Sequence, residues 1–364
     1  MNDIDELKQF VVAHARVQNI PRETYTALLG RIAHDDGDSP GSWVAEWSRA
    51  AEALERQGKP LEACRHYNMA RFPYVDGPAR REALNRCVAN FDQWRHADPD
   101  IQPLEIEVDG GRVRCWTSGL SADHPKPVLL GLGGIVSVKE QWGPILTNAS
   151  KLGMAGVVTE MPGVGENTLR YTADSWQMLS AVLDALGTRA NTAQTYAVAL
   201  SFSGHMALRC ALEDPRIRGI VTAGAPVDAF FTDTAWRQRI PRVTVDTLAH
   251  LTGTDPSLVG EHISGWALTS KDLRRLDIPV STIVSRRDEI VPARDPELLR
   301  EHVGTAYLLE NDDVHGSPSH ADESRLWTVL SLLRMRGGFL PQRAVLRGVL
   351  GATRTRHRLF GVRT

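Results

Sequence analysis

The chain has 364 residues, of which 42% are hydrophobic and 24% are charged, so it can bury a large core as one large domain or two ordinary ones. Its formal net charge of −2 gives no overall electrostatic reason to bind nucleic acid or an acidic surface. We therefore expect a small-molecule substrate as partner, with no nucleic acid and no membrane, and we leave a homodimer open.

The four cysteines indicate a reducing compartment. They are scattered, form no pair with the spacing of metal ligands, and mostly have apolar neighbours, at Cys64, Cys87, Cys115 and Cys210. The first twenty residues begin with acids and lack the continuous apolar core of a secretory signal. No later apolar stretch is long enough to span a bilayer. These features favour a cytoplasmic protein with no metal site.

Residues 1–100 have a helical pattern. The segments "SWVAEWSRAAEALERQG" (42–58) and "PLEACRHYNMARF" (60–72) carry apolar residues at three- and four-residue spacing. The polar, proline-containing "RHADPDIQP" (95–103) then marks a boundary near residue 100. We expect an N-terminal helical region that serves as a lid or cap.

Beyond this boundary, short strands alternate with helical stretches. "LEIEVDGGRVRCWTS" (104–118) predicts a hairpin around Asp109, Gly110 and Gly111. Six further strands are expected within residues 126–134, 154–163, 195–201, 217–226, 278–288 and 304–312. Apolar strands separated by helices predict an α/β fold, with a mostly parallel sheet covered on both faces, over residues 101–340. Ligands of such sheets bind at the carboxyl ends of the strands.

Two further segments complete the organisation. An insertion at about 228–276 follows a core strand, in a place from which it could fold over the strand ends as a cap. The C-terminal segment 341–364 is rich in arginine and contains no acidic residue. We expect this basic tail to be solvated and partly frayed, and we assign it no function.

The segment "ALSFSG" contains the candidate nucleophile. Aligned with the G-x-S-x-G nucleophile elbow, it places Ser201 at the centre, with Ala199 two residues before and Ser203 two residues after. The elbow strains the backbone of its central residue, so the flanking residues must be small, and alanine and serine meet that demand. Taking Ser203 as the nucleophile would put the bulky His205 at a flank. We therefore interpret Ser201 as the nucleophile and keep Ser203 as the alternative.

Two later loops supply the partners of a catalytic triad. Asp288 lies just beyond a predicted strand, and His315 lies in the loop after the next one. Alone, Asp288 could be a turn-capping carboxylate and His315 a surface histidine. Together with Ser201 they follow the order Ser, Asp, His of α/β-hydrolase triads. Their nearest competitors, which we interpret as loop or supporting residues, are Asp312, Asp313 and His320.

An acyl-transfer site also needs hydrogen-bond donors for the developing oxyanion. One is expected to be the backbone N–H of Phe202, at the start of the helix after the nucleophile. The other is expected from Ile135, because Gly133 and Gly134 end a strand and leave its N–H free to face the pocket, with Gly134 bordering the substrate. A glycine turn with no catalytic role is the alternative.

Several of these segments occur together in a known family. They are "YNMARFP", "GGIVSVKEQW", "EMPGVGEN", "ALSFSGHMALR", "RRDEIVP" and "NDDVHGSP". Through them, most of residues 40–335 resembles the α/β-hydrolase superfamily, within it the branch of esterases related to the fermentation/respiration switch protein. That branch includes esterases, hydrolases that cleave carbon–carbon bonds in polyketides or dihydroxylated aromatic ketones, and acetate-eliminating enzymes of spirotetronate antibiotic assembly. The resemblance implies an α/β-hydrolase fold with Ser201 as nucleophile, Asp288 as orienting acid and His315 as base.

The leading functional hypothesis is a cofactor-independent enzyme that cleaves an acyl or carbon–carbon bond in a small, fairly apolar, natural-product-like substrate. Two alternatives remain: elimination of acetate with His315 as the base, and a non-catalytic scaffold that only binds ligands. The N-terminal helices and the insertion are expected to roof the pocket. The candidates for its walls, for each of which core packing is the alternative, are Tyr67, Phe72, Trp236 and Trp266.

Overall fold

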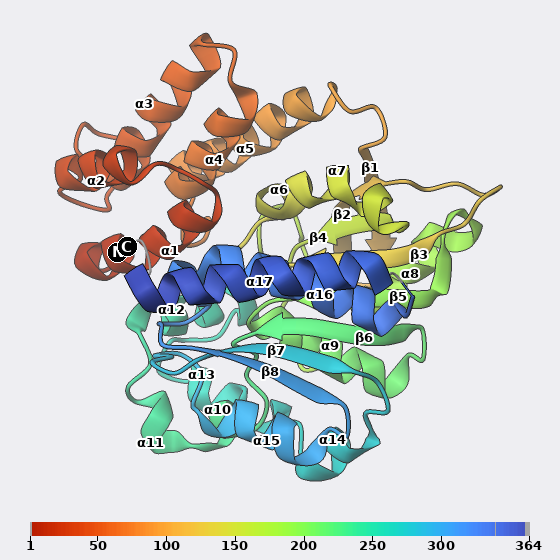
Figure 1. Ribbon diagram of the computed structural model, residues 1–364. Helices are drawn as coiled ribbons and strands as arrows, with labels where there is room; N and C mark the ends of the chain where they lie inside the picture. Colours follow the sequence, from red (N-terminus) through yellow and green to blue (C-terminus); the bar gives the residue numbers. More distant parts are fainter. Residues whose placement is uncertain (1, 339, 361–364) are drawn as a thin grey trace.

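The computed structural model describes residues 2–338 and 340–360. Its centre is an eight-stranded sheet with the order β1-β2-β4-β3-β5-β6-β7-β8 (Figure 1). The strands are β1 (Gln102–Val108), β2 (Gly111–Ser118), β3 (Pro127–Leu132), β4 (Ala155–Thr159), β5 (Asn191–Ala199), β6 (Ile217–Ala223), β7 (Val280–Ser285) and β8 (Ala306–Asn311). Only the pairs β1–β2 and β2–β4 are antiparallel; the other strand pairs are parallel. The predicted hairpin, the six further strands and the mostly parallel sheet are all confirmed.

Helices cover both faces of the sheet because side chains alternate between the faces along each strand. Val128 and Leu130 of β3 belong to the core beneath α8 (Gln177–Leu186) and α9 (Phe202–Glu213). Leu129, between them, belongs to a second core with Trp327 of α16 (Ala321–Arg336). These two cores fix the sheet between layers of helices, and the carboxyl ends of the parallel strands lie together at one edge.

The C-terminal segment is mostly exposed, as expected of a solvated tail, but it is more ordered than the expectation of partial fraying. The structure forms a helix, α17 (Leu340–Phe360), which lies beside α16 along the sheet (Figure 1). Leu346 and Leu350, four residues apart, pack into the second core, so burial of an apolar stripe holds the helix despite its many arginines. Residues 361–364 of the predicted tail lie outside the described residues.

The N-terminal region is helical, as predicted, and forms its own layer at one side of the sheet (Figure 1). Its helices are α1 (Ile4–Val17), α2 (Arg22–Arg31), α3 (Trp43–Arg56), α4 (Pro60–Ala70) and α5 (Pro78–Arg95). Trp43 and Trp47 are fully buried between them, and the Trp43 indole N–H donates to the Met69 carbonyl at 2.8 Å. The layer contacts the rest of the chain through α1, α4 and α5.

Short helices complete the strand connections. α6 (Lys139–Trp142) and α7 (Leu146–Ala149) join β3 to β4. The segment between β6 and β7 contains α10 (Ala229–Thr232), α11 (Thr234–Arg237), α12 (Arg242–Thr252), α13 (Val259–His262) and α14 (Ser270–Arg275), and α15 (Arg294–His302) precedes β8. The start of the segment between β6 and β7 is held in place by Asp295. Its buried carboxylate accepts hydrogen bonds from the backbone amides of residues 227–230.

Two further features concern the environment of the chain. All four cysteines are unpaired and buried. Within residues 2–338 and 340–360, none of the helices has the length and apolar character needed to cross a bilayer.

Phe91 of α5 joins the helical layer to the sheet. Its ring lies 5.0 Å from the Trp116 ring of β2, centroid to centroid, and is fully buried. It occupies the space beside Gly143, where any Cβ would overlap the Phe91 ring. The absence of a side chain at Gly143 therefore leaves the space that the Phe91 ring occupies.

Replacing this ring should destabilise the whole chain. We expect Phe91→Ala to lower the free energy of unfolding by about 3–5 kcal/mol, because it removes buried apolar surface and leaves a cavity between layers. Phe91→Leu, which keeps most of the volume, should lose much less. Chemical denaturation measures both, and an unchanged midpoint for Phe91→Ala would show that the two layers do not depend on this contact.

Candidate active site

The turn after β5 holds Ser201 in a strained conformation. Its φ of 56° and ψ of −130° lie in a region that residues other than glycine rarely adopt. The Ser201 N–H donates to the Ala223 carbonyl at 2.8 Å, and the Gly204 N–H donates to the Ser201 carbonyl at 2.8 Å. A Cβ at Gly204 would overlap the Thr222 hydroxyl, so the start of α9 can lie this close to β6 only because Gly204 has no side chain. The geometry is that of a nucleophile elbow.

Ser203, the alternative nucleophile, is not accessible from the cavity. It is fully buried, and its hydroxyl donates to the carbonyls of Leu200, at 2.9 Å, and Leu132, at 3.4 Å. Ala199, on the other side of the elbow, is also fully buried. Both flanking residues are therefore packed in the interior. Of the two serines, Ser201 is the one that lines the cavity at the strand ends.

Ser201, His315 and Asp288 lie in one hydrogen-bonded row. The His315 Nε2 atom is 3.0 Å from the Ser201 hydroxyl oxygen, and Nδ1 lies 2.9 and 3.0 Å from the two Asp288 oxygens. The backbone amides of Ile290 and Val291 donate to Asp288 Oδ1 at 2.9 and 2.8 Å. These two amides orient the Asp288 carboxylate. The carboxylate in turn orients the imidazole by accepting a hydrogen bond from Nδ1–H.

The loop after β8 is held by an acid that is not part of this row. Asp313 accepts hydrogen bonds from the amides of Val314, at 2.9 Å, and Ser319, at 2.7 Å, and its carboxylate lies 3.2 Å from His320 Nδ1. Asp312 instead pairs with Arg287 at the surface. The competing residues therefore have the loop and supporting positions expected for them.

His315 also contacts a second carboxylate. Its backbone N–H donates to Glu289 at 3.0 Å. Burial disfavours the charged imidazole, but the charges of Asp288 and Glu289 and the hydrogen bond to Asp288 outweigh burial, so the pKa of His315 lies above its ordinary value. The side chain can therefore hold a proton taken from Ser201.

Two backbone amides border the same space. Phe202 is the first residue of α9, and Ile135 lies in the loop between β3 and α6. Within the described residues neither N–H has a protein acceptor. A Cβ at Gly134 would lie 3.0 Å from the Ser201 Cβ, so the missing side chain lets the loop approach the serine. Together these amides could stabilise a negative oxygen beside Ser201.

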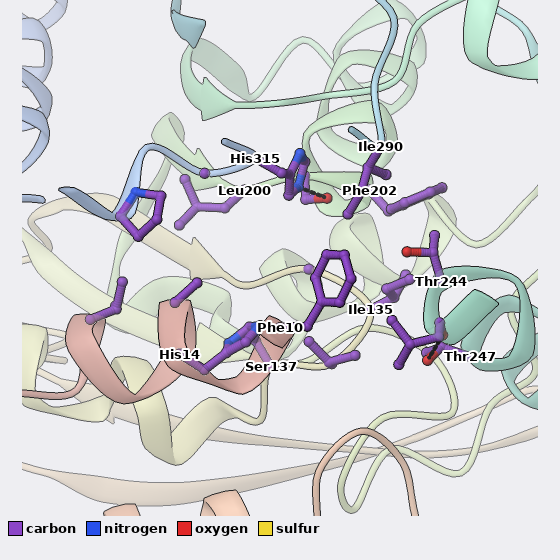
Figure 2. A pocket seen from close by; sticks show the side chains of 18 of the residues that line it. Phe10, His14, Ile135, Ser137, Leu200, Phe202, Thr244, Thr247, Ile290 and His315 are labelled. Carbon is purple, nitrogen blue, oxygen red and sulfur yellow. Dashed lines mark hydrogen bonds between the residues drawn. The ribbon is translucent and has the colours of Figure 1, made fainter. Parts of the chain in front are cut away.

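A cavity of about 200 Å³ opens at this point, between the strand ends, α1 and α12. Figure 2 shows Phe10 and His14 of α1 on one side, Thr244 and Thr247 of α12 on another, and His315 across from them. Most other lining side chains are apolar, among them Phe72, Ile135, Leu200, Phe202 and Ile290. The site can therefore exclude water and enclose an apolar ligand.

Only some of the residues predicted to wall the pocket lie at this cavity. Phe72 and Gly134 line the cavity, whereas Tyr67, Trp236 and Trp266 do not. The Tyr67 hydroxyl donates to Glu55 at 3.1 Å within the helical layer. The Trp236 indole donates to the Ile290 carbonyl, and the Trp266 ring packs edge-on against Tyr171 at 5.0 Å. Tyr67 and Trp266 are buried core residues, whereas Trp236 is half-buried, with the Arg239 guanidinium 5.1 Å from the centre of its ring.

Sequence reasoning missed the residues that α1 and α12 contribute. Phe10 and His14 lie four residues apart on one face of α1, and Thr244 and Thr247 lie three apart on α12. The helical spacing is visible in the sequence, but nothing in it says which helix crosses the strand ends. Burial, the Arg71 charge and the facing His315 lower the pKa of His14 to about 3, so this second imidazole stays neutral.

The loop that carries Ile135 ends in a buried charge cluster. Lys139 is almost fully buried, and its ammonium lies 2.8 Å from Glu140, 3.3 Å from Glu160 and 2.8 Å from Glu166. Its backbone N–H donates to Glu160 at 3.0 Å. No group of three or more histidine, cysteine or acidic side chains within residues 2–338 and 340–360 could hold a metal ion.

Comparisons with known proteins show the family to which the chain belongs. The model of a family described as Esterase FrsA-like matches residues 31–311. The solved structure of AbyA5 is 53% identical, with a TM-score of 0.93, and the match covers 97% of this chain and all of that one. Esterase FrsA of Citrobacter koseri is 27% identical over 298 residues, which cover 76% of this chain and 68% of the relative. The structure of a 2,6-dihydroxy-pseudo-oxynicotine hydrolase, 19% identical, has the same fold with a TM-score of 0.65, covering 93% and 94%.

Gly224, after β6, offers a direct test of the site's geometry. Its φ is +60°, and a Cβ there would lie 2.5 Å from His315 Cε1 and 2.8 Å from Nδ1. We expect Gly224→Ala to displace the imidazole, lengthening the distance from Nε2 to the Ser201 oxygen beyond about 3.5 Å in a crystal structure. Gly30→Ala, on a helix with open space around the new methyl group, is the control. An undisturbed row in Gly224→Ala would mean that the glycine does not set the position of His315.

Proposed function

The chain belongs to the FrsA-like esterase family of α/β-hydrolases, and on that premise we propose that it is a cofactor-independent enzyme that cleaves an ester, acyl or carbon–carbon bond. The observation that carries this proposal is the strained Ser201 with its hydroxyl 3.0 Å from His315 Nε2. The substrate we propose is a small, apolar, polyketide-like natural product, because most of the residues that line the cavity are apolar.

The reaction begins at the serine hydroxyl. As the Ser201 oxygen attacks the substrate carbonyl carbon, its proton passes to His315 Nε2, and Asp288 stabilises the imidazolium. The carbonyl oxygen becomes negative and accepts hydrogen bonds from the amides of Phe202 and Ile135. His315 then returns the proton to the leaving group, whose bond to the carbonyl carbon breaks. Water, deprotonated by His315, releases the acid and restores Ser201.

A second candidate reaction rests on the altered elbow. Ala199 and Ser203 stand where the motif has glycines, and both are tightly packed. In this reaction His315 would remove a proton from the carbon beside the one that bears an acetate ester, and acetate would leave as an alkene forms. Ser201 would then only position the substrate. A non-catalytic scaffold is the third candidate, and the complete hydrogen-bonded row argues against it.

Isotopic water separates these reactions. The substrate analogue would be an acetate ester with a removable proton on the carbon next to the ester-bearing carbon, incubated in H₂¹⁸O and followed by mass spectrometry. Hydrolysis incorporates ¹⁸O into the released acid, because water ends the acyl-enzyme. Elimination releases unlabelled acetate and an alkene. No turnover of this or related small esters and β-diketones would favour the binding scaffold.

Substitution of the two serines tests the assignment of the nucleophile. We expect Ser201→Ala to reduce kcat/KM about a thousandfold or more, because the covalent step is lost. Ser203→Ala, the matched control, removes only a hydroxyl bonded to backbone carbonyls and should keep kcat/KM within a few-fold. Loss of activity in Ser203→Ala but not in Ser201→Ala would reverse the assignment. Near-normal activity in Ser201→Ala with loss in His315→Ala would favour elimination.

The pH dependence should report the environment of His315. Only the neutral imidazole can accept a proton, and the pKa of His315 is raised, so activity should fall as the pH drops through a midpoint above the ordinary value of about 6.5. Asp288→Asn should move this midpoint to lower pH and reduce kcat, whereas Asp312→Asn at the surface should do neither. The measurement is kcat/KM against pH. A midpoint unmoved by Asp288→Asn would contradict the assigned base.

A further inference from the structure

Arg71, at the end of α4, is a buried cation next to the active site. Only 2% of its surface is exposed, and the hydrogen bonds that the structure gives its guanidinium all go to neutral oxygens, of Asn68, Pro73 and Val136. Burial lowers the pKa of Arg71 to about 10, so the group remains charged at neutral pH. A buried charge without a carboxylate partner is costly. Arg80, in the same helical layer, instead pairs with Asp35 and Asp76.

The bond to Val136 connects Arg71 to the backbone amide of Ile135, which borders the cavity beside Ser201. The Val136 carbonyl, which accepts from Arg71 Nη2, belongs to the same peptide group as the Ser137 N–H. That N–H donates to the Gly134 carbonyl at 3.0 Å, and this carbonyl shares its peptide group with the Ile135 N–H. The guanidinium thus lies at the head of a chain of two peptide groups that ends at Ile135.

The guanidinium and the far end of the loop are each held by hydrogen bonds. Asn68 accepts from Arg71 at 2.6 and 2.9 Å and donates to Gln18 at 2.9 Å, so the guanidinium is anchored within the helical layer. Further along the loop, the Lys139 N–H donates to Glu160, the residue that follows β4. The loop carrying Ile135 is therefore held between the two layers.

We propose that Arg71 is a positioning residue, which orients the Ile135 amide and polarises it through the two linked peptide groups. A cation that bonds to the first carbonyl strengthens each following hydrogen bond, because dipoles in a chain reinforce one another. The last N–H then becomes a better donor to a negative oxygen on the substrate. This inference rests on the proposed function and extends it, since it gives the helical layer a part in the chemistry.

The test compares Arg71→Met and Arg71→Lys with Arg80→Lys. The first probe is a serine-directed fluorophosphonate, whose attack by Ser201 places negative charge on the phosphoryl oxygen. We expect Arg71→Met to slow labelling by about a hundredfold, near the lower range for loss of an oxyanion donor. Arg71→Lys keeps the charge but loses the planar set of guanidinium N–H donors, so it should be labelled faster than Arg71→Met but more slowly than wild type. Arg80→Lys, which changes a buried arginine away from the loop, should label at the wild-type rate.

Steady-state kinetics supply the second readout. On an ester substrate, the Arg71 variants should lose kcat with little change in KM, because the oxyanion forms only after binding. If Arg71→Met does not fold, Arg71→Lys alone decides, with circular dichroism and thermal unfolding confirming its fold. A folded Arg71 variant that labels and turns over within twofold of wild type would overturn the inference. Wild-type protein that fails to label at Ser201 would instead overturn the proposed function.

Discussion

The backbone of Ser201 is the constraint on which the rest of the site depends. A residue with a side chain is held at φ 56° and ψ −130°, and it persists there only because its surroundings leave no alternative. Gly134 and Gly204 have no side chains and so leave room for the loop and the helix to pack closely around this turn. The Ala223 carbonyl accepts a hydrogen bond from the Ser201 N–H. The strain directs the hydroxyl out of the sheet edge and towards His315. Strand, loop and helix are thereby arranged around one oxygen atom.

The helical layer completes a site that the sheet alone leaves open. Phe10 and His14 of α1 line the cavity. Arg71, at the end of α4, donates a hydrogen bond to Val136 in the loop that carries Ile135. The low pKa of His14 keeps this second imidazole uncharged in a mostly apolar cavity that also contains His315. Phe91 joins this layer to β2 beside Gly143. The cavity and the loop that carries Ile135 therefore both depend on residues far in sequence from Ser201, Asp288 and His315.

The sequence shows most of the fold and the centre of the site, because both depend on local patterns. Apolar runs between turn residues mark the strands, and the order Ser201, Asp288, His315 follows from what lies at three strand ends. Tyr67, Trp236 and Trp266 were wrong as pocket walls, since aromatic character predicts burial but not the surface against which a ring packs. His14 and Thr247 were missed because helical spacing does not reveal which helix crosses the cavity. The helix of the arginine-rich tail was missed, because its apolar stripe of Leu346 and Leu350 lies among charges, although most of its other side chains are exposed as expected.

The central claim is that Ser201 attacks with its oxyanion held by the Ile135 and Phe202 amides. A crystal structure of the protein after reaction with a small alkyl fluorophosphonate tests it most directly, because the adduct resembles the tetrahedral intermediate. The account predicts phosphorus bonded to Ser201 Oγ and a phosphoryl oxygen about 2.7–3.1 Å from both backbone nitrogens. A phosphoryl oxygen that points away from these amides, or phosphorus bonded to another residue, would contradict it.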